Sequence, residues 1–96
     1  MTQQQYIELR NQVAEDVNVI TANFAATRQV DGTAVEKLRE RCFDARRRVS
    51  GKAVDVRAAI CEVAGAAGKC SIDRDISQLS AALLKLDRAI ASRCRV

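Results

Sequence analysis

The chain has 96 residues, 48% of them hydrophobic and 29% charged, a balance typical of one folded domain that excludes a disordered chain. It has no histidine, so the usual general base and metal ligand is missing, and no proline, so nothing forbids long helices. Sixteen cationic and twelve anionic side chains give a net charge of +4, which permits an acidic partner or a nucleic acid but requires neither. No apolar run approaches the roughly 18 residues of a membrane span, and no secretory signal is visible. We therefore expect a cytoplasmic protein that does not contact a membrane.

The first predicted helix covers about residues 3–29. Its apolar residues recur every three or four positions from Tyr6 to Phe24. Thr2 and Gln5 have the spacing of a capping box at its start, and Asp31-Gly32 is a turn signal after its end.

The second predicted helix covers about residues 33–67 and begins with a second capping-box spacing, Thr33 and Glu36. Its apolar positions are three or four residues apart throughout, and their phase continues through Ser50-Gly51. This continuity predicts one long helix, with a kink or break at Ser50-Gly51 as the alternative. The stripe consists of Val35, Leu38, Cys42, Ala45, Val49, Ala53, Val56, Ile60, Val63 and Ala67.

The third predicted helix covers about residues 72–94, after a helix end at Gly68 and a cap at Ser71 or Asp73. Together the three helices predict an all-α fold, an antiparallel up-down-up three-helix bundle that forms a single domain over residues 1–96. The buried stripe expected on the third helix is Ile72, Ile76, Leu79, Leu83, Leu86, Ile90 and Cys94.

The four cysteines have the spacing C-x18-C-x8-C-x23-C, without the C-x2-C pair of a zinc site. Folding the second and third helices into a hairpin would bring Cys42 near Cys94, although we expect reduced thiols in a cytoplasmic protein. The segment GAAGKCS fails the spacing of a phosphate-binding loop. We therefore expect no catalytic residues, no cofactor, no metal and no enzymatic activity.

A cluster of eight cations lies between Lys37 and Arg57, but its members scatter around the helix. Arg39, Arg46 and Arg57 flank one edge of the apolar stripe. The opposite edge could contact phosphates or an acidic partner, and it consists of Lys37, Arg41, Arg48 and Lys52. A nucleic-acid-associated protein that uses this edge is the alternative function, and ordinary solvated helix edges are the simpler interpretation.

Some apolar residues lie outside the predicted core stripes. Phe43, Val54 and Cys61 form a second stripe on the middle helix, and Leu84 and Val19 point outward from the other two helices. Exposed apolar faces usually mark partner sites. The sequence thus predicts a non-enzymatic helical interaction module, such as an adaptor, a chaperone-like protein or an assembly subunit. Its partner would be a second copy in a homodimer or another helical protein.

Overall fold

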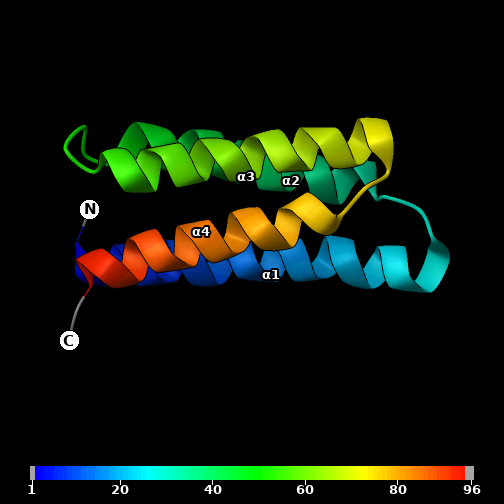
Figure 1. Ribbon diagram of the computed structural model, residues 1–96, viewed down its shortest axis with the longest axis horizontal. Helices are drawn as coiled ribbons and strands as arrows, with labels where there is room; N and C mark the ends of the chain where they lie inside the picture. Colours follow the sequence, from blue (N-terminus) through cyan, green and yellow to red (C-terminus); the bar gives the residue numbers. More distant parts are fainter. Residues whose placement is uncertain (1, 95–96) are drawn as a thin grey trace.

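The computed structural model describes residues 2–94, which form four helices and no strand (Figure 1). The prediction of an all-helical protein is confirmed, but the predicted number of three helices is wrong. The helices are α1 (Gln3–Thr27), α2 (Gly32–Arg48), α3 (Val54–Asp73) and α4 (Ser77–Arg93). None of these described helices combines the length and the apolar content needed to cross a membrane.

The helices form an up-down-up-down bundle with short connections, 39 Å long and 23 by 17 Å across. Each helix packs against its neighbours in sequence, and α4 closes the bundle against α1. Figure 1 shows α2 and α3 in one layer and α1 and α4 in the other, with the start of α1 and the end of α4 at the same end. The diagonal pairs are therefore α1 with α3 and α2 with α4.

The long helix predicted over residues 33–67 is instead an antiparallel hairpin of α2 and α3. The chain reverses at residues 49–53, where the Ala53 amide donates to the Ser50 carbonyl at 2.9 Å and the Lys52 amide donates to Ser50 Oγ at 3.2 Å. Val49 and Ala53 are both buried on either side of this reversal. Their separation of four residues equals a helical repeat, so the apolar phase continues although the helix does not.

The boundary between the last two helices also lies later than predicted. Helix α3 continues past Gly68 to Asp73 and ends at Arg74, whose φ of 56° is left-handed. Ile72, which was expected in the buried stripe of the last helix, is 81% exposed on α3. Near the start of α4, the Ser77 amide donates to the Asp75 carboxylate at 2.9 Å, so neither Ser71 nor Asp73 provides the cap.

The start of α1 follows the prediction, because Thr2 and Gln5 form the expected capping box. Helix α1 ends at Thr27 and is followed by Arg28 in a left-handed conformation, with φ of 59°. Asp31, and not Thr33, caps α2: its carboxylate accepts from the amides of Thr33 and Ala34.

One aliphatic core extends through all four helices. Its largest fully buried side chains include Leu38 on α2, Ile60 on α3 and Leu86 on α4. Helix α3 contributes mainly small residues, and alanine lets neighbouring helices approach closely. Its buried alanines are Ala59, Ala64, Ala66 and Ala67.

Candidate functional site

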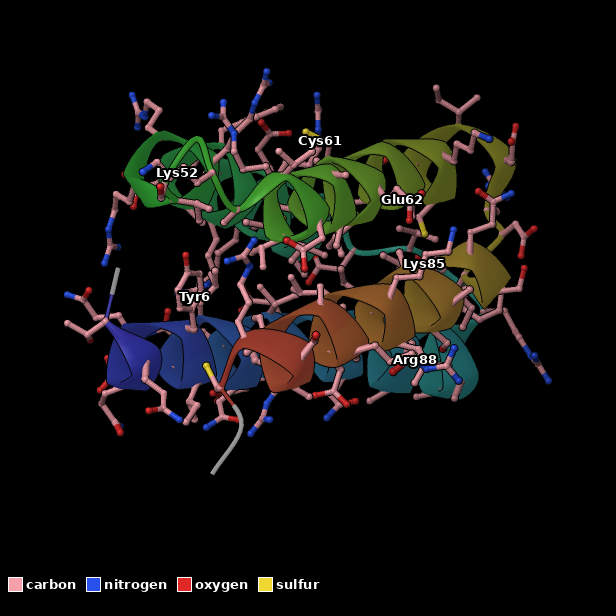
Figure 2. The ribbon with its side chains drawn as sticks, turned by 60° about the vertical axis from the view of Figure 1, so that its left-hand side comes forward. Tyr6, Lys52, Cys61, Glu62, Lys85 and Arg88 are labelled. Carbon is pink, nitrogen blue, oxygen red and sulfur yellow. The ribbon has the colours of Figure 1, made fainter. Side chains whose placement is uncertain are left out.

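Exposed apolar side chains gather on the outer face of the α2–α3 hairpin. Phe43 on α2 is 47% exposed, Val54 at the start of α3 is 67% exposed, and Cys61 on α3 is exposed as well. Figure 2 shows Cys61 on the side of this layer that is turned away from α1 and α4. Two adjoining hollows on this face share Arg46 and Arg57, and together we call them the hairpin groove. Its lining residues are Phe43, Arg46, Arg47, Gly51, Val54, Arg57, Ala58 and Cys61.

The antiparallel course of the hairpin explains why these residues converge. Arg46 lies shortly before the turn and Arg57 shortly after it, so the reversal brings one opposite the other. Gly51 lies between them in the turn, and a Cβ atom there would be 3.7 Å from Arg57 Nη1. The absence of a side chain at Gly51 thus leaves the floor of the groove open beside the guanidinium.

The charges of the hairpin groove are mostly positive and only partly neutralised. Arg39 lies over the Phe43 ring, with its guanidinium carbon 5.7 Å from the ring centroid, and also pairs with Glu36 at 3.5 Å. Arg47 pairs with Asp44 at 3.3 Å. Arg46 and Arg57 form no ion pair with any of residues 2–94. Two guanidinium groups therefore face the groove without a carboxylate partner.

Helix α4 holds the turn of the hairpin in place. Arg93 donates to the Asp55 carboxylate at 2.8 and 3.0 Å and to the Lys52 carbonyl at 3.2 Å. The hydrogen bonds from Arg93 lower the pKa of Asp55 below its ordinary value. The turn that closes one end of the hairpin groove is thus tied to the end of α4.

The four cations predicted on the opposite edge do not form one free basic surface. Arg41 lies between α1 and α2, where its Nε donates to Asp16 at 2.6 Å and its Nη1 donates to Gln12 at 2.9 Å. Arg48 lies 3.5 Å from the Asp44 carboxylate. Lys37 and Lys52 are exposed, and Figure 2 shows Lys52 at the turn end of the hairpin.

Leu84 and Val19 lie away from the hairpin groove. Leu84, 48% exposed, belongs to a second hollow between α1 and α4, which we call the α1–α4 groove. Val19 is exposed on α1 and lines neither groove. An ion pair of 3.4 Å between Arg10 Nε and Asp87 borders the α1–α4 groove. The groove is lined by Arg10, Ala14, Ser80, Leu83, Leu84 and Asp87.

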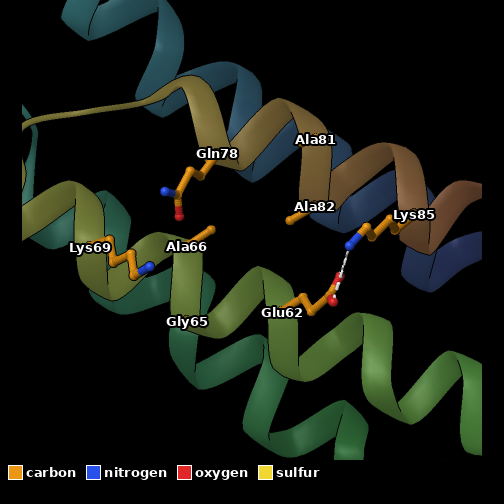
Figure 3. A pocket seen from close by; sticks show the side chains of 8 residues that line it. All are labelled: Glu62, Gly65, Ala66, Lys69, Gln78, Ala81, Ala82 and Lys85. Atoms are coloured by element: carbon orange, nitrogen blue, oxygen red, sulfur yellow. Dashed lines mark hydrogen bonds and ion pairs between the residues drawn. The ribbon is translucent and has the colours of Figure 1, made fainter.

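A third hollow, between α3 and α4, was not expected from the sequence (Figure 3). Its floor is made of small residues such as Gly65, Ala66 and Ala82, which in the sequence resemble ordinary helix contacts. Lys85 Nζ lies 3.2 Å from the Glu62 carboxylate across its opening. Glu62 and Lys85 thus neutralise each other, Lys69 adds one further cation to the lining, and the floor offers methyl groups and backbone.

The cysteines do not lie together. Cys42 and Cys70 are buried, Cys61 is exposed and Cys94 is partly buried, and all four are free. Cys42 is on α2, whereas Cys94 directly follows α4 and its Sγ donates to the Gln3 carbonyl of α1 at 3.7 Å. Because α2 and α4 are diagonal and not in contact, the proximity expected from a three-helix arrangement is wrong. Among residues 2–94, no three Cys, Asp or Glu side chains gather as a set of metal ligands would.

The chain matches no protein-family model, no curated protein and no solved structure. Its geometry defines a class nonetheless: a four-helix bundle whose outer hairpin face carries an apolar groove lined by arginines. Function has to be argued from that groove.

Proposed function

We propose that the protein is a non-enzymatic helical interaction module that binds another protein through the hairpin groove. The observation that carries this proposal is the exposure of Phe43 and Val54 on a bundle that already has a complete core. Neither side chain is needed to cover that core, and exposed apolar groups in a hollow are typical of partner sites. The module could serve as an adaptor, a chaperone-like protein or an assembly subunit.

The chemistry of the groove favours binding over catalysis. Its polar groups are the guanidinium groups of Arg46, Arg47 and Arg57 and the thiol of Cys61. Guanidinium groups stay protonated at all physiological pH values, so they bind anions but do not transfer protons. The groove therefore offers apolar contact and fixed positive charge.

Replacing Phe43 with alanine is expected to weaken partner binding at least tenfold while changing the free energy of unfolding by less than about 1 kcal/mol. The partner can be represented by helical peptides selected from a displayed library of mixed charge. Affinities for the wild type and for the variant would be measured by fluorescence anisotropy. Val19→Ala is the matched control, because Val19 is exposed to the same extent, 47%, but lies outside the grooves.

Selected peptides that bind the wild type and Phe43→Ala equally well would contradict the proposal. The same holds if binding is lost in Val19→Ala, because the docking surface would then lie on α1. Melting curves of both variants exclude loss of the fold as the cause.

Self-association is a second candidate, and the α1–α4 groove is the surface that favours it. Its apolar floor includes Leu83 and Leu84, and its border carries one cation, Arg10, and one anion, Asp87. A two-fold arrangement could place the cation of one copy beside the anion of the other. The hairpin groove is less suited to a second copy, because its arginines would face one another.

If the α1–α4 groove is a dimer interface, Leu84→Lys is expected to raise the dimer dissociation constant about tenfold or more, since it buries an unpaired charge. Sedimentation equilibrium at high micromolar concentration measures this, with Val19→Lys as the control. A wild type that remains monomeric under these conditions would exclude this second candidate and leave the hairpin groove as the docking surface.

A further inference from the structure

We infer that the partner of the hairpin groove is an acidic amphipathic helix. This inference rests on the proposed function, and it adds the charge and the secondary structure of the segment that binds. The helix would lie along the groove between α2 and α3, with its apolar side on the floor and its carboxylates at the arginines.

The distribution of charge indicates the sign of the partner. Helix α2 carries six cationic side chains and three carboxylates, the largest excess of positive charge on any helix of the chain. Arg46 and Arg57, from opposite sides of the turn, have no ion-pair partner among residues 2–94. Guanidinium groups bind carboxylates in a bidentate manner, so a carboxylate that enters here meets two donors without competition from the chain itself.

The shape of the groove indicates a helix. The groove runs between two antiparallel helices, and the ridge of side chains on a third helix fits such a furrow. Its apolar lining is Val54, Ala58 and Cys61 on α3 and Phe43 on α2, all of them exposed. Apolar residues spaced three and four apart on the partner would contact this lining, and carboxylates beside them would reach Arg46 and Arg57.

A nucleic acid fits the same surface less well. Arg47 and Arg48 both pair with Asp44, so Arg46 and Arg57 are the unpaired cations of the groove among residues 2–94, which is few for a backbone of successive phosphates. Val54 is 67% exposed and offers no stacking or hydrogen-bonding group to a base. The face of Phe43, which could stack on a base, is already shared with Arg39.

The inference is tested with three synthetic amphipathic helices that share the same leucine anchors and differ on the polar face, which is glutamate, glutamine or lysine. We expect the glutamate helix to bind the wild type about tenfold more tightly than the glutamine helix, and the lysine helix not to bind. The double variant Arg46→Glu/Arg57→Glu should bind the glutamate helix at least tenfold more weakly than the wild type does, and the lysine helix more tightly. Fluorescence anisotropy measures the affinity for each of the three helices, and circular dichroism checks that the variant is folded.

The matched control is the double variant Lys69→Glu/Arg88→Glu. It changes the net charge by the same amount, and both of its positions are exposed and lie outside the hairpin groove. Figure 2 shows Arg88 on the opposite layer, on α4. This control should still bind the glutamate helix more tightly than the glutamine helix. If it loses as much affinity for the glutamate helix as Arg46→Glu/Arg57→Glu does, the inference is overturned, because the net charge of the protein would then explain the binding.

The other outcomes separate this inference from the proposed function. If the glutamate and glutamine helices bind equally well and Phe43→Ala abolishes both interactions, the inference of an acidic partner is overturned. The proposed function then stays in place. If no helix binds, duplex DNA and single-stranded RNA are titrated at two salt concentrations. Nucleic-acid binding that Arg46→Glu/Arg57→Glu abolishes would overturn both and assign the groove to phosphates. No binding of any probe would also overturn both.

Discussion

Replacing Arg41 with methionine is expected to lower the free energy of unfolding by about 3 kcal/mol. The reason is Asp16, which is only 7% exposed and is the one charged residue that is buried among residues 2–94. Arg41 Nε lies 2.6 Å from its carboxylate, between α1 and α2. Without that guanidinium the carboxylate stays buried and uncompensated, which costs more than the ion pair contributes. The Arg41 side chain is 28% exposed, so the expected loss lies at the lower end for buried pairs.

Urea denaturation at neutral pH measures this loss. The double variant Asp16→Leu/Arg41→Met removes both charges and should recover most of the stability, because an apolar pair can replace a buried ion pair. Arg48→Met is the control, since Arg48 and Asp44 form an exposed pair, and it should change the free energy of unfolding by less than about 0.5 kcal/mol. If Arg41→Met costs as little as this control, Asp16 is accessible to water in solution.

The helix break shows where prediction from the sequence reached its limit. The buried positions of residues 35–67 were expected in the right phase, but a phase does not report the direction of the chain. Val49 and Ala53 are four residues apart both in a helix and across this turn, and the turn residues between them are exposed. Gly51 carries no signal of its own, since its φ is not positive. Ser50-Gly51 marks the position of the alternative prediction, a kink or break, which is where the chain reverses, but only the packing of α2 on α3 decides between that alternative and one continuous helix.

The helix ends were missed for a different reason. Helices α1 and α3 both end at an arginine in the left-handed region, Arg28 and Arg74, which glycine usually occupies. Gly68 therefore has the sequence features of a helix end although it lies within α3. The cap of α1, in contrast, was predicted, because Thr2 and Gln5 act through bonds between residues close in sequence. The caps of α2 by Asp31 and of α4 by Asp75 are equally local, but the sequence offers competing caps at Thr33, Ser71 and Asp73, so a local signal alone did not decide these boundaries.

The grouping of Phe43, Val54 and Cys61 was predicted on a single helix, and the structure brings them together on two. All three lie on the same angular side of the apolar stripe. When a helix is folded back into an antiparallel hairpin, residues on that side of each half converge between the two halves. Arg46 and Arg57 lie on this side too, so the reversal joins them to the apolar residues. Their meeting could not be predicted while residues 33–67 were treated as one helix.

The stability of the protein is expected to fall above pH 9 because of Cys42. Burial, and then the negative charge of Asp16, raises the pKa of Cys42 from 9.0 to about 12, although Arg41 partly opposes the shift. The folded state therefore keeps this thiol protonated at pH values where the unfolded chain would release the proton. Its contribution to stability is complete below pH 9 and is lost progressively between pH 9 and about 12.

Within that window the free energy of unfolding falls by about 1.4 kcal/mol for each pH unit, so its decrease from pH 8 to 10.5 should be about 2 kcal/mol. Other groups titrate in the same range, and comparison with Cys42→Ala removes their contribution. The free energy of unfolding of wild type minus that of Cys42→Ala, from urea denaturation, should decrease by about 2 kcal/mol between the two pH values. Cys94→Ala, which removes a partly buried thiol that does not contribute to the shift in the pKa of Cys42, should keep the wild-type slope. A parallel pH dependence of wild type and Cys42→Ala would mean that Cys42 ionises as readily in the folded protein as in the unfolded chain, and it would contradict this prediction.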